Sequence, residues 1–405
     1  MKILLATYWS IPHLGGVWNY MDQLRTALES LGHEVDILGF GDENTTIHIV
    51  NQTFKIAYAT LLPSLQVKLN PQDFPHIYQH PLIQYTEFRR AAYDWFLTQL
   101  NLGQYDIIHA QDVVSAASFA KNLFNRSTLI ATIHGSVAHE IKRQLETIHL
   151  SSTAPLAELY FEQLEHVGAT STAVTITANN WLKKILSGDF NVPSNHIKVL
   201  PYGFDTIGFL KKLETSTYIP RPENKKIIFF SGRLVEIKGI QYLLPALAQL
   251  KTIRNDFVCW IAGTGDHEEA LKMMSQQLGL TTDVFFLGRR DDIPSLLSNA
   301  DIFVQPSLLD NQPLSLIEAQ LAGVPSIVSD AGGLPEMVQH GINGFVIPKE
   351  NSEEMCRYLN ILLTNEQSRL RLGTNAKAFA LAHWDMNTGV EKLLTIYTEA
   401  IKNRR

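Results

Sequence analysis

The feature that most constrains the fold is a regular alternation between short apolar runs and stretches with helical periodicity. Such alternation is typical of βαβ units, in which helices cover a parallel sheet. The first six runs are KILLAT, EVDILG, DIIHAQ, TLIATIHG, AVTIT and IKVLP, and the next six are IIFFSG, FVCWIAG, VFFLG, IFVQPS, PSIVSD and GFVIP. The sequence therefore predicts an α/β protein with two doubly wound parallel sheets.

Two domains are expected, because 405 residues exceed what one ordinary hydrophobic core accommodates. The first is assigned to residues 1–204, since the chain becomes polar, charged and proline-containing after VLPYGFD. The second is assigned to residues 205–385. Residues 386–405 are expected to form a helix that returns to the first domain. Residues 40–100 show weak periodicity and have no assigned role.

Composition and charge exclude several classes of protein. A hydrophobic fraction of 45% with 18% charged residues is typical of a globular protein, and no long apolar run suggests a membrane span. The net charge of −6 argues against general nucleic-acid binding. MKILLATYWS is too short for a signal-peptide core, and the two cysteines, Cys259 and Cys356, suit a reducing cytosol. A cytoplasmic protein is expected.

Ligands of doubly wound sheets bind at the carboxyl ends of the strands, so the loops after the apolar runs are the candidate sites. Gly15 and Gly16 precede a helix, whose first N–H groups could meet a phosphate, although a simple turn explains them equally well. Arg233 and Lys238, in SGRLVEIKG, suit two adjacent phosphates. The alternative is a pair of solvated surface cations.

Two further loops carry suggestive residues. Gly263 and Gly265, in IAGTGDHEEA, separate an apolar run from a helix, but a tight turn also accounts for them. No complete G-x-G-x-x-G fingerprint is present. His134, in ATIHGS, ends an apolar run, where a neutral imidazole could hydrogen-bond a sugar hydroxyl; a structural histidine is the alternative.

The most specific segment is PSLLDNQPLSLIEAQLAG, in which seven residues separate Asp310 from Glu318. A proline costs little at a helix start, so one acid is expected in the loop and the other in the helix. Two carboxylates beside an anion site would repel the anion unless each faced neutral hydroxyls, which indicates a nucleotide sugar. The backbone expected to meet its phosphate is formed by Asn311, Gln312, Pro313 and Leu314.

These motifs, together with VLPYGFD, resemble those of the retaining glycosyltransferases of family 4. The resemblance covers most of the chain and implies the GT-B fold, with two Rossmann-like domains facing across a cleft. It implies that Arg233 and Lys238 bind the donor diphosphate, that Glu318 holds the ribose and that Asp310 holds the transferred sugar. The stretch Gly263–Gly265 would lie near the nucleotide.

The resemblance also assigns roles outside these loops. Gly16 would let its loop approach the diphosphate, His134 would contact the sugar, and Arg289 would lie near the nucleotide. Two departures from the family pattern bear on the donor sugar: Asp310 stands where glutamate is commoner, and a glycine often found between the acids is replaced in DNQPLS.

The implied reaction transfers a hexosyl unit with retention, from a UDP-sugar or alternatively a GDP-sugar, without a metal or other cofactor. The acceptor could be a saccharide, a lipid or a small molecule. A nucleotide-sugar epimerase and a non-catalytic nucleotide-sugar binding protein are alternatives. HEIKRQLETIHL is a candidate for peripheral contact with the inner face of a membrane, although a solvated helix face is the simpler interpretation.

Overall fold

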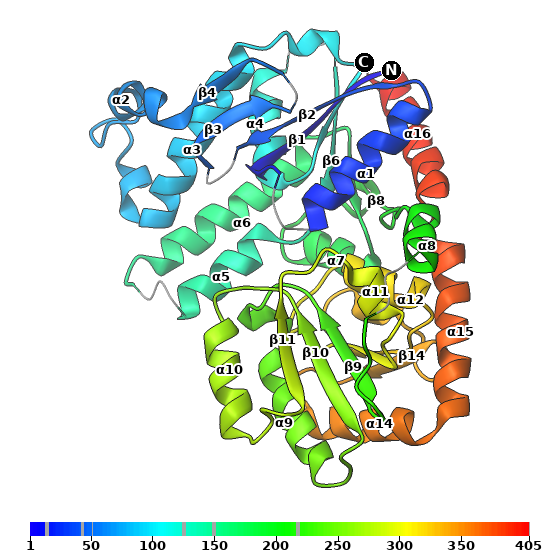
Figure 1. Cartoon of the computed structure of the whole chain (residues 1–405). Helices are drawn as coiled ribbons and strands as arrows, with labels where there is room; N and C mark the ends of the chain where they lie inside the picture. Colours follow the sequence, from blue (N-terminus) through cyan, green and yellow to red (C-terminus); the bar gives the residue numbers. More distant parts are fainter. Residues whose placement is uncertain are drawn as a thin grey trace. The chain divides into compact units, whose positions relative to one another are not determined.

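The computed structural model divides into two compact units (Figure 1). Unit 1 comprises Met1–Pro201 and Asn387–Arg405, and unit 2 comprises Tyr202–Met386. The structure describes residues 1–12, 16–41, 44–50, 52–123, 127–147, 151–215 and 219–404. Gly15 and the end of the HEIKRQLETIHL stretch, residues 148–150, lie outside this set.

Unit 1 is built on an eight-stranded sheet with the order β4-β3-β2-β1-β5-β6-β7-β8. Neighbouring strands are parallel, except that β3 is antiparallel to both β2 and β4. The strands are β1 (Lys2–Ser10), β2 (Glu34–Phe40), β3 (Thr46–Ile49), β4 (Lys55–Ala57), β5 (Ile107–Ala110), β6 (Thr128–Ile133), β7 (Val174–Thr177) and β8 (Ile197–Val199). The expectation of a wholly parallel sheet misses β3 and β4, because TIHI and KIA are short and only partly apolar.

The helices of unit 1 follow the strands in the βαβ manner. They are α1 (Gly16–Ser30), α2 (Tyr58–Lys68), α3 (Pro81–Thr98), α4 (Val113–Asn122), α5 (Val137–Thr147), α6 (Ala154–Thr170), α7 (Asn180–Gly188) and α16 (Met386–Asn403). Asn179 caps α7, since its side-chain oxygen accepts a hydrogen bond from Leu182 N at 2.9 Å. The hydroxyl of Tyr397 in α16 lies 2.7 Å from Nδ1 of the buried His109 in β5, and this hydrogen bond anchors α16 on the sheet of unit 1.

Unit 2 contains a six-stranded, fully parallel sheet with the order β11-β10-β9-β12-β13-β14. Its strands are β9 (Lys226–Ser231), β10 (Phe257–Ala262), β11 (Val284–Gly288), β12 (Ile302–Gln305), β13 (Ser326–Ser329) and β14 (Gly344–Ile347). Its helices are α8 (Thr206–Glu214), α9 (Ile240–Lys251), α10 (Glu268–Gln277), α11 (Ile293–Leu297), α12 (Leu314–Leu321), α13 (Leu334–Met337), α14 (Ser352–Thr364) and α15 (Glu366–His383). Among the described helices of either unit, none combines the length and apolar character that a membrane crossing requires.

The central strand β9 shows why unit 2 needs helices on both faces of its sheet. Ile228 and Phe230 belong to one apolar core, whereas Ile227 and Phe229 belong to the core on the opposite face. All four side chains are fully buried. A strand buried on both faces reads as a continuous apolar run, which is the pattern that IIFFS presents in the sequence.

The boundaries of unit 2 are set by pairing between its two ends. Phe204 N donates to Trp384 O at 2.7 Å, and Met386 N donates to Phe204 O at 3.0 Å. Tyr202 N also donates to the side chain of Gln312, at 2.9 Å. These bonds place residues 202–204 and residue 386 in unit 2, whereas the breaks expected from the sequence follow residues 204 and 385.

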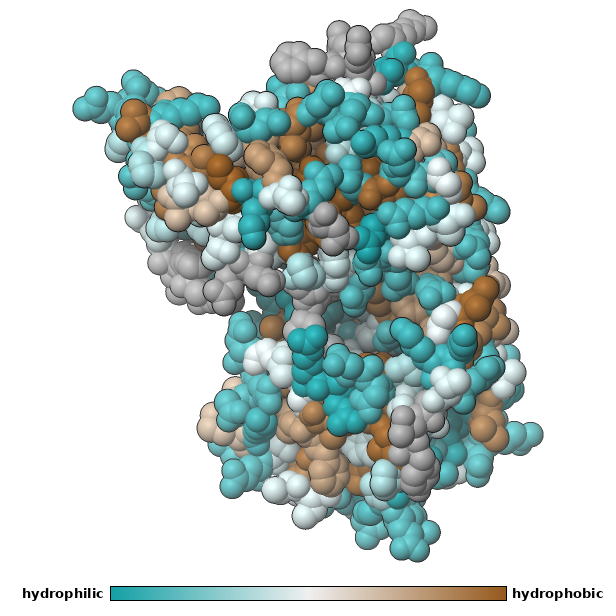
Figure 2. All heavy atoms as spheres, turned by 45° about the horizontal axis from the view of Figure 1, so that its top comes forward, coloured by the Kyte–Doolittle hydropathy of each residue, from teal (hydrophilic) through white to brown (hydrophobic). Residues whose placement is uncertain are grey.

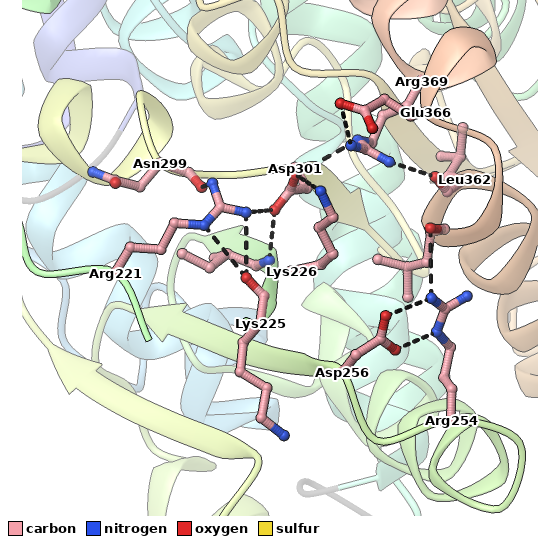
Figure 3. Close-up of polar contacts among 12 residues, drawn as sticks. Arg221, Lys225, Lys226, Arg254, Asp256, Asn299, Asp301, Leu362, Glu366 and Arg369 are labelled. Carbon is pink, nitrogen blue, oxygen red and sulfur yellow. Dashed lines mark hydrogen bonds and ion pairs between the residues drawn. The ribbon is translucent and has the colours of Figure 1, made fainter. Parts of the chain in front are cut away.

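Asp301, at the amino end of β12, organises a network of ion pairs away from the strand ends that carry the candidate site (Figure 3). Its carboxylate is paired with Arg221, with Lys226 at 3.7 Å and with Arg369 of α15 at 3.5 Å, and it accepts Ile227 N at 2.8 Å. The side chains of Asp301 and Arg369 are only 9% and 6% exposed. One carboxylate thus connects the linker before β9, two neighbouring strands and a helix.

We expect Asp301→Ala to lower the free energy of unfolding of unit 2 by about 3–5 kcal/mol, because a buried guanidinium and a backbone N–H lose their partner. Chemical denaturation would measure the change. The matched control is Asp291→Ala, whose side chain is 91% exposed and should change stability by less than about 0.5 kcal/mol. Equal stabilities of the two variants would contradict the role assigned to Asp301.

Candidate active site

Four neighbouring strands of unit 2 carry the predicted site residues in the loops at their carboxyl ends. Arg289 follows β11, Gly263–Gly265 follows β10, Arg233 follows β9 and Asp310 follows β12. These strands are adjacent and parallel, so their carboxyl ends lie at one edge of the sheet. The topology therefore brings together residues that are up to 77 positions apart in the sequence (from 233 to 310).

Lys238 and Asp310 are in direct contact. Lys238 Nζ lies 2.7 Å from Asp310 Oδ2, and their side chains are only 15% and 11% exposed. Gly239, which follows Lys238, has a φ of 72°, and a Cβ there would lie 1.9 Å from the carbonyl oxygen of Pro306. Only glycine allows the Lys238 turn to pack this closely against the loop after β12.

Two residues that the sequence did not single out donate hydrogen bonds to the Asp310 carboxylate. Gln305 Nε2 and Ser307 Oγ donate to Asp310 Oδ2 at 3.0 and 2.9 Å. Gln305 ends β12 and is fully buried with Ser307. Their only sequence signal is that two polar residues close the apolar run IFVQPS, which on its own reads as a strand end.

The glycines after β10 have a structural explanation. Gly263 has a φ of 134°, and a Cβ there would lie 1.9 Å from the carbonyl oxygen of Gly232. A Cβ at Gly265 would lie 2.4 Å from the carbonyl oxygen of Leu234. The two glycines thus let their loop pack against the loop that carries Arg233, whose own side chain is exposed. Arg289 is also exposed, with Asp291 3.8 Å away.

The segment between the two acids is fastened to Tyr202. Gln312 accepts from Tyr202 N at 2.9 Å and donates to Tyr202 O at 3.2 Å, while Asn311 Nδ2 donates to the Tyr202 hydroxyl at 2.9 Å. Gln312 is buried, and both its amide oxygen and its amide nitrogen are used in hydrogen bonds to Tyr202. Pro313 is the N-cap of α12, and Leu314 is its first residue.

Glu318 lies inside α12, as the sequence predicts, and is half-buried. Burial raises the pKa of Glu318 to about 7, an effect that the charge of Lys212 partly offsets. Its carboxyl group therefore titrates near neutral pH. Such a group accepts hydrogen bonds from hydroxyls when ionised and loses one acceptor site when protonated.

In unit 1, His134 follows β6 and contacts a residue that follows the adjacent strand β5. His134 Nε2 lies 2.9 Å from Gln111 Oε1, and Gln111 Nε2 donates to His109 O at 3.4 Å. The amide nitrogen of Gln111 donates to the His109 carbonyl, so the amide oxygen of Gln111 is the atom that faces His134. An oxygen can only accept, so His134 Nε2 must carry the hydrogen of this bond. Burial lowers the pKa of His134 to about 3, so the imidazole is neutral at physiological pH.

Gln111 is a third residue that the sequence did not reveal, although it too closes an apolar run, DIIHAQ. Tyr20 of α1 supports the other side of His134, with ring centroids 5.4 Å apart. Gly16 is the exposed first residue of α1, and a Cβ there would meet no atom within 4 Å. Within the described ranges, no cluster of three or more histidine, cysteine, aspartate or glutamate side chains could hold a metal ion.

Comparisons with known proteins match both units. The family model for Glycosyltransferase Family 4 matches residues 14–207, and the model for Glycosyl transferases group 1 matches residues 213–379. An uncharacterized glycosyltransferase, MJ1607 of Methanocaldococcus jannaschii, is 25% identical over 99% of each chain. A UDP-Gal:alpha-D-GlcNAc-diphosphoundecaprenol alpha-1,3-galactosyltransferase of Escherichia coli is 25% identical over 74% of this chain and 77% of its own length.

A solved structure shows the same fold. Alr3699/HepE of Anabaena, in complex with UDP, superimposes with a TM-score of 0.69 at 21% identity and covers 98% of this chain and all of its own length. Two family models together span most of the chain, and a relative that is named a glycosyltransferase matches it over 99% of each chain. The chain belongs to glycosyltransferase family 4 and is a glycosyltransferase with the GT-B fold.

Proposed function

We propose that this enzyme transfers a hexosyl unit, with retention of configuration, from a nucleotide diphosphate sugar to a hydroxyl of a saccharide, lipid or small-molecule acceptor. The observation that carries the proposal is the placement of Lys238, Arg233 and Glu318 around one sheet edge. Two cations suit a diphosphate and a carboxylate suits ribose hydroxyls. UDP is the favoured nucleotide, which the UDP complex of the Anabaena protein supports, and GDP is the alternative.

The proposed reaction breaks the bond between the anomeric carbon and the phosphate oxygen. The acceptor hydroxyl forms its new bond on the same face, and its proton passes to the departing diphosphate. Most of the catalysis would come from orienting the two substrates and from stabilising the charge that develops on the diphosphate. Lys238, Arg233 and the N-terminal amides of α12 would provide that stabilisation.

Asp310 is proposed to act on Lys238 as well as on the transferred sugar. The Oδ2 atom of Asp310 accepts hydrogen bonds from Lys238, Gln305 and Ser307, so the Lys238 ammonium group is held in place before a donor sugar binds. A lysine ammonium has three hydrogens. One can remain on Asp310 while others meet phosphate oxygens, so the pair need not break when the donor binds.

We propose that the protein's own cations neutralise the diphosphate and that no metal or other cofactor takes part. In unit 1, His134 is proposed to hydrogen-bond a hydroxyl of the transferred sugar as a neutral imidazole. We also propose that the enzyme acts in the cytoplasm. The test of the proposed function is a screen of UDP-, GDP- and ADP-sugars for turnover, followed by NMR of the product anomer. Inverted product would refute retention.

We expect Lys238→Ala to lower kcat by about 10²–10³-fold, because a positioned charge on the leaving group is lost. The measurement is turnover with the best donor from the screen. Lys349→Ala is the matched control, since Lys349 is an exposed lysine of the same unit, and it should leave kcat unchanged. Near-normal turnover of a folded Lys238→Ala enzyme would overturn the role of Lys238.

We expect the affinity for UDP-glucose to rise between about pH 6 and about pH 8. Ribose hydroxyls donate to the ionised form of Glu318, so binding favours loss of a proton from a group whose pKa is raised to about 7. Calorimetric titrations across this range would measure the slope. Glu318→Gln should bind more weakly at pH 8 and show no slope, whereas an unchanged slope would exclude Glu318 as its source.

In the Glu318→Gln background, in which Glu318 no longer titrates, we expect Gln111→Glu to move the acid limb of the kcat/KM profile toward neutral pH. A carboxylate 2.9 Å from His134 favours the imidazolium form and raises the pKa of His134, so less of the neutral imidazole remains at pH 6. The exposed substitution Gln99→Glu adds the same charge to unit 1 without this contact. Superimposable profiles of the two variants would contradict the assignment.

A further inference from the structure

A groove of about 550 Å³ lies between α2 and α3, within the region of unit 1 that had no assigned role. On α2 it is lined by Tyr58, Leu62 and Gln66, which are spaced four residues apart and so share one helix face. In the sheet of unit 1, β4 is the edge strand that leads directly into α2 (Figure 1). Figure 2 shows hydrophobic and intermediate surface gathered among hydrophilic atoms on the lobe that carries these helices.

The α3 wall of the groove is aromatic and held in position. Tyr85 is 53% exposed, yet its hydroxyl oxygen accepts a hydrogen bond from Arg89 Nη1 at 2.9 Å. The Arg89 guanidinium also lies 5.2 Å from the centroid of the Tyr85 ring. Arg89 is itself buried and donates to Asn44 Oδ1 at 2.7 Å. At the far end, the Tyr78 hydroxyl donates to Leu69 O at 2.7 Å. The rings therefore need little ordering when a ligand binds, which lowers the entropic cost of binding.

The groove starts at the same sheet edge as His134. β4 runs parallel to β1, because both β2–β3 and β3–β4 are antiparallel, so Tyr58 leaves the carboxyl edge just as His134 does after β6. Five strand spacings separate β4 from β6 in the sheet order. At about 4.8 Å per spacing this is about 24 Å, more than one sugar ring spans.

The lining has the chemistry of a site for neutral saccharides. All nine described residues that line the groove are uncharged, and they combine aromatic rings with two side-chain amides. Aromatic faces pack against the C–H faces of sugars, and amides can both donate to and accept from hydroxyls. An anionic lipid surface or an acidic polymer would instead call for cations in the lining. The aromatic and amide members of the lining are Tyr58, Gln66, Tyr78, Gln84, Tyr85 and Phe88.

We propose that this groove is a distal subsite for an extended, neutral saccharide acceptor. The assignment rests on the proposed transfer function and adds the acceptor class to it: an oligosaccharide whose reacting end lies near His134 and whose remote sugars lie on Tyr85 and Tyr58. The separation along the sheet edge explains why a short acceptor would leave the groove empty.

Binding without a donor tests the groove directly. Neutral hexasaccharides of the gluco-, manno- and galacto-series, an acidic galacturonate hexasaccharide and phosphatidylglycerol vesicles would be titrated onto the full chain. We expect at least one neutral hexasaccharide to bind, about tenfold more weakly to Tyr85→Ala and to Gln84→Ala, and nearly unchanged to Tyr85→Phe, which keeps the ring. Trp95→Ala, which removes an exposed aromatic on α3 outside the lining, is the matched control.

The proposal is overturned if no neutral hexasaccharide binds, if Tyr85→Ala binds as well as Trp95→Ala, or if the groove substitutions abolish vesicle or galacturonate binding instead. Kinetics separates this outcome from failure of the proposed function. With an active donor, Tyr85→Ala should raise KM for the hexasaccharide and leave KM for its disaccharide unchanged; equal effects refute the distal subsite. If no nucleotide sugar turns over at all, the proposed transfer function is refuted. Saccharide binding at Tyr85 is then still decided by the titrations without a donor.

Discussion

Burial of the parallel strands on both faces is the constraint on which the rest of the molecule depends. In β9, Phe229 and Phe230 point into opposite cores and neither has any exposed surface. Side chains in the middle of such a strand cannot reach a polar ligand, so binding chemistry is confined to the strand ends. The four loops at the carboxyl edge of unit 2 and the His134 loop of unit 1 occupy the positions that this constraint leaves available.

The contact between Lys238 and Asp310 is the main ion pair described at this edge. A buried ion pair gains little stability by itself, because both groups lose hydration. Here Gln305 and Ser307 supply additional hydrogen bonds to the carboxylate, which offset part of that cost. The result is a lysine whose ammonium group is held in one position by the carboxylate.

Much of this arrangement could be predicted from the sequence, because it depends on local patterns. Apolar runs such as IIFFSG located the strands, and a proline between Asp310 and Glu318 separated the loop from α12. Gln111 and Gln305 could not be identified in this way. Each ends an apolar run, and its role depends on a partner from another loop, which only the strand order reveals.

The segment covering β3, β4, α2 and α3 was also missed, for a different physical reason. Its strands pair antiparallel and are very short: β3 has four residues and β4, the edge strand, has three with none of them buried, so neither is long enough to show a clear period. Its aromatic residues are divided between the core and the groove: Tyr93 of α3 is fully buried in the core, whereas Tyr85 is exposed in the groove. Periodicity alone cannot separate these two uses of an aromatic side chain.

Gln312, in the DNQPLS segment that departs from the family pattern, fastens that segment to Tyr202. Its amide pairs with both the N–H and the C=O of Tyr202, as a neighbouring strand would, and Asn311 holds the Tyr202 hydroxyl. A glycine in place of either residue would have no side chain with which to make these contacts. The loop that carries Asp310 is therefore held at two nearby points: Gln312 contacts Tyr202, and Asp310 O accepts a hydrogen bond from Gly333 N at 2.9 Å. The carboxylate of Asp310 is held as well, because Lys238 Nζ, Gln305 Nε2 and Ser307 Oγ all donate to its Oδ2 atom, so both the backbone and the side chain of Asp310 are fixed by hydrogen bonds.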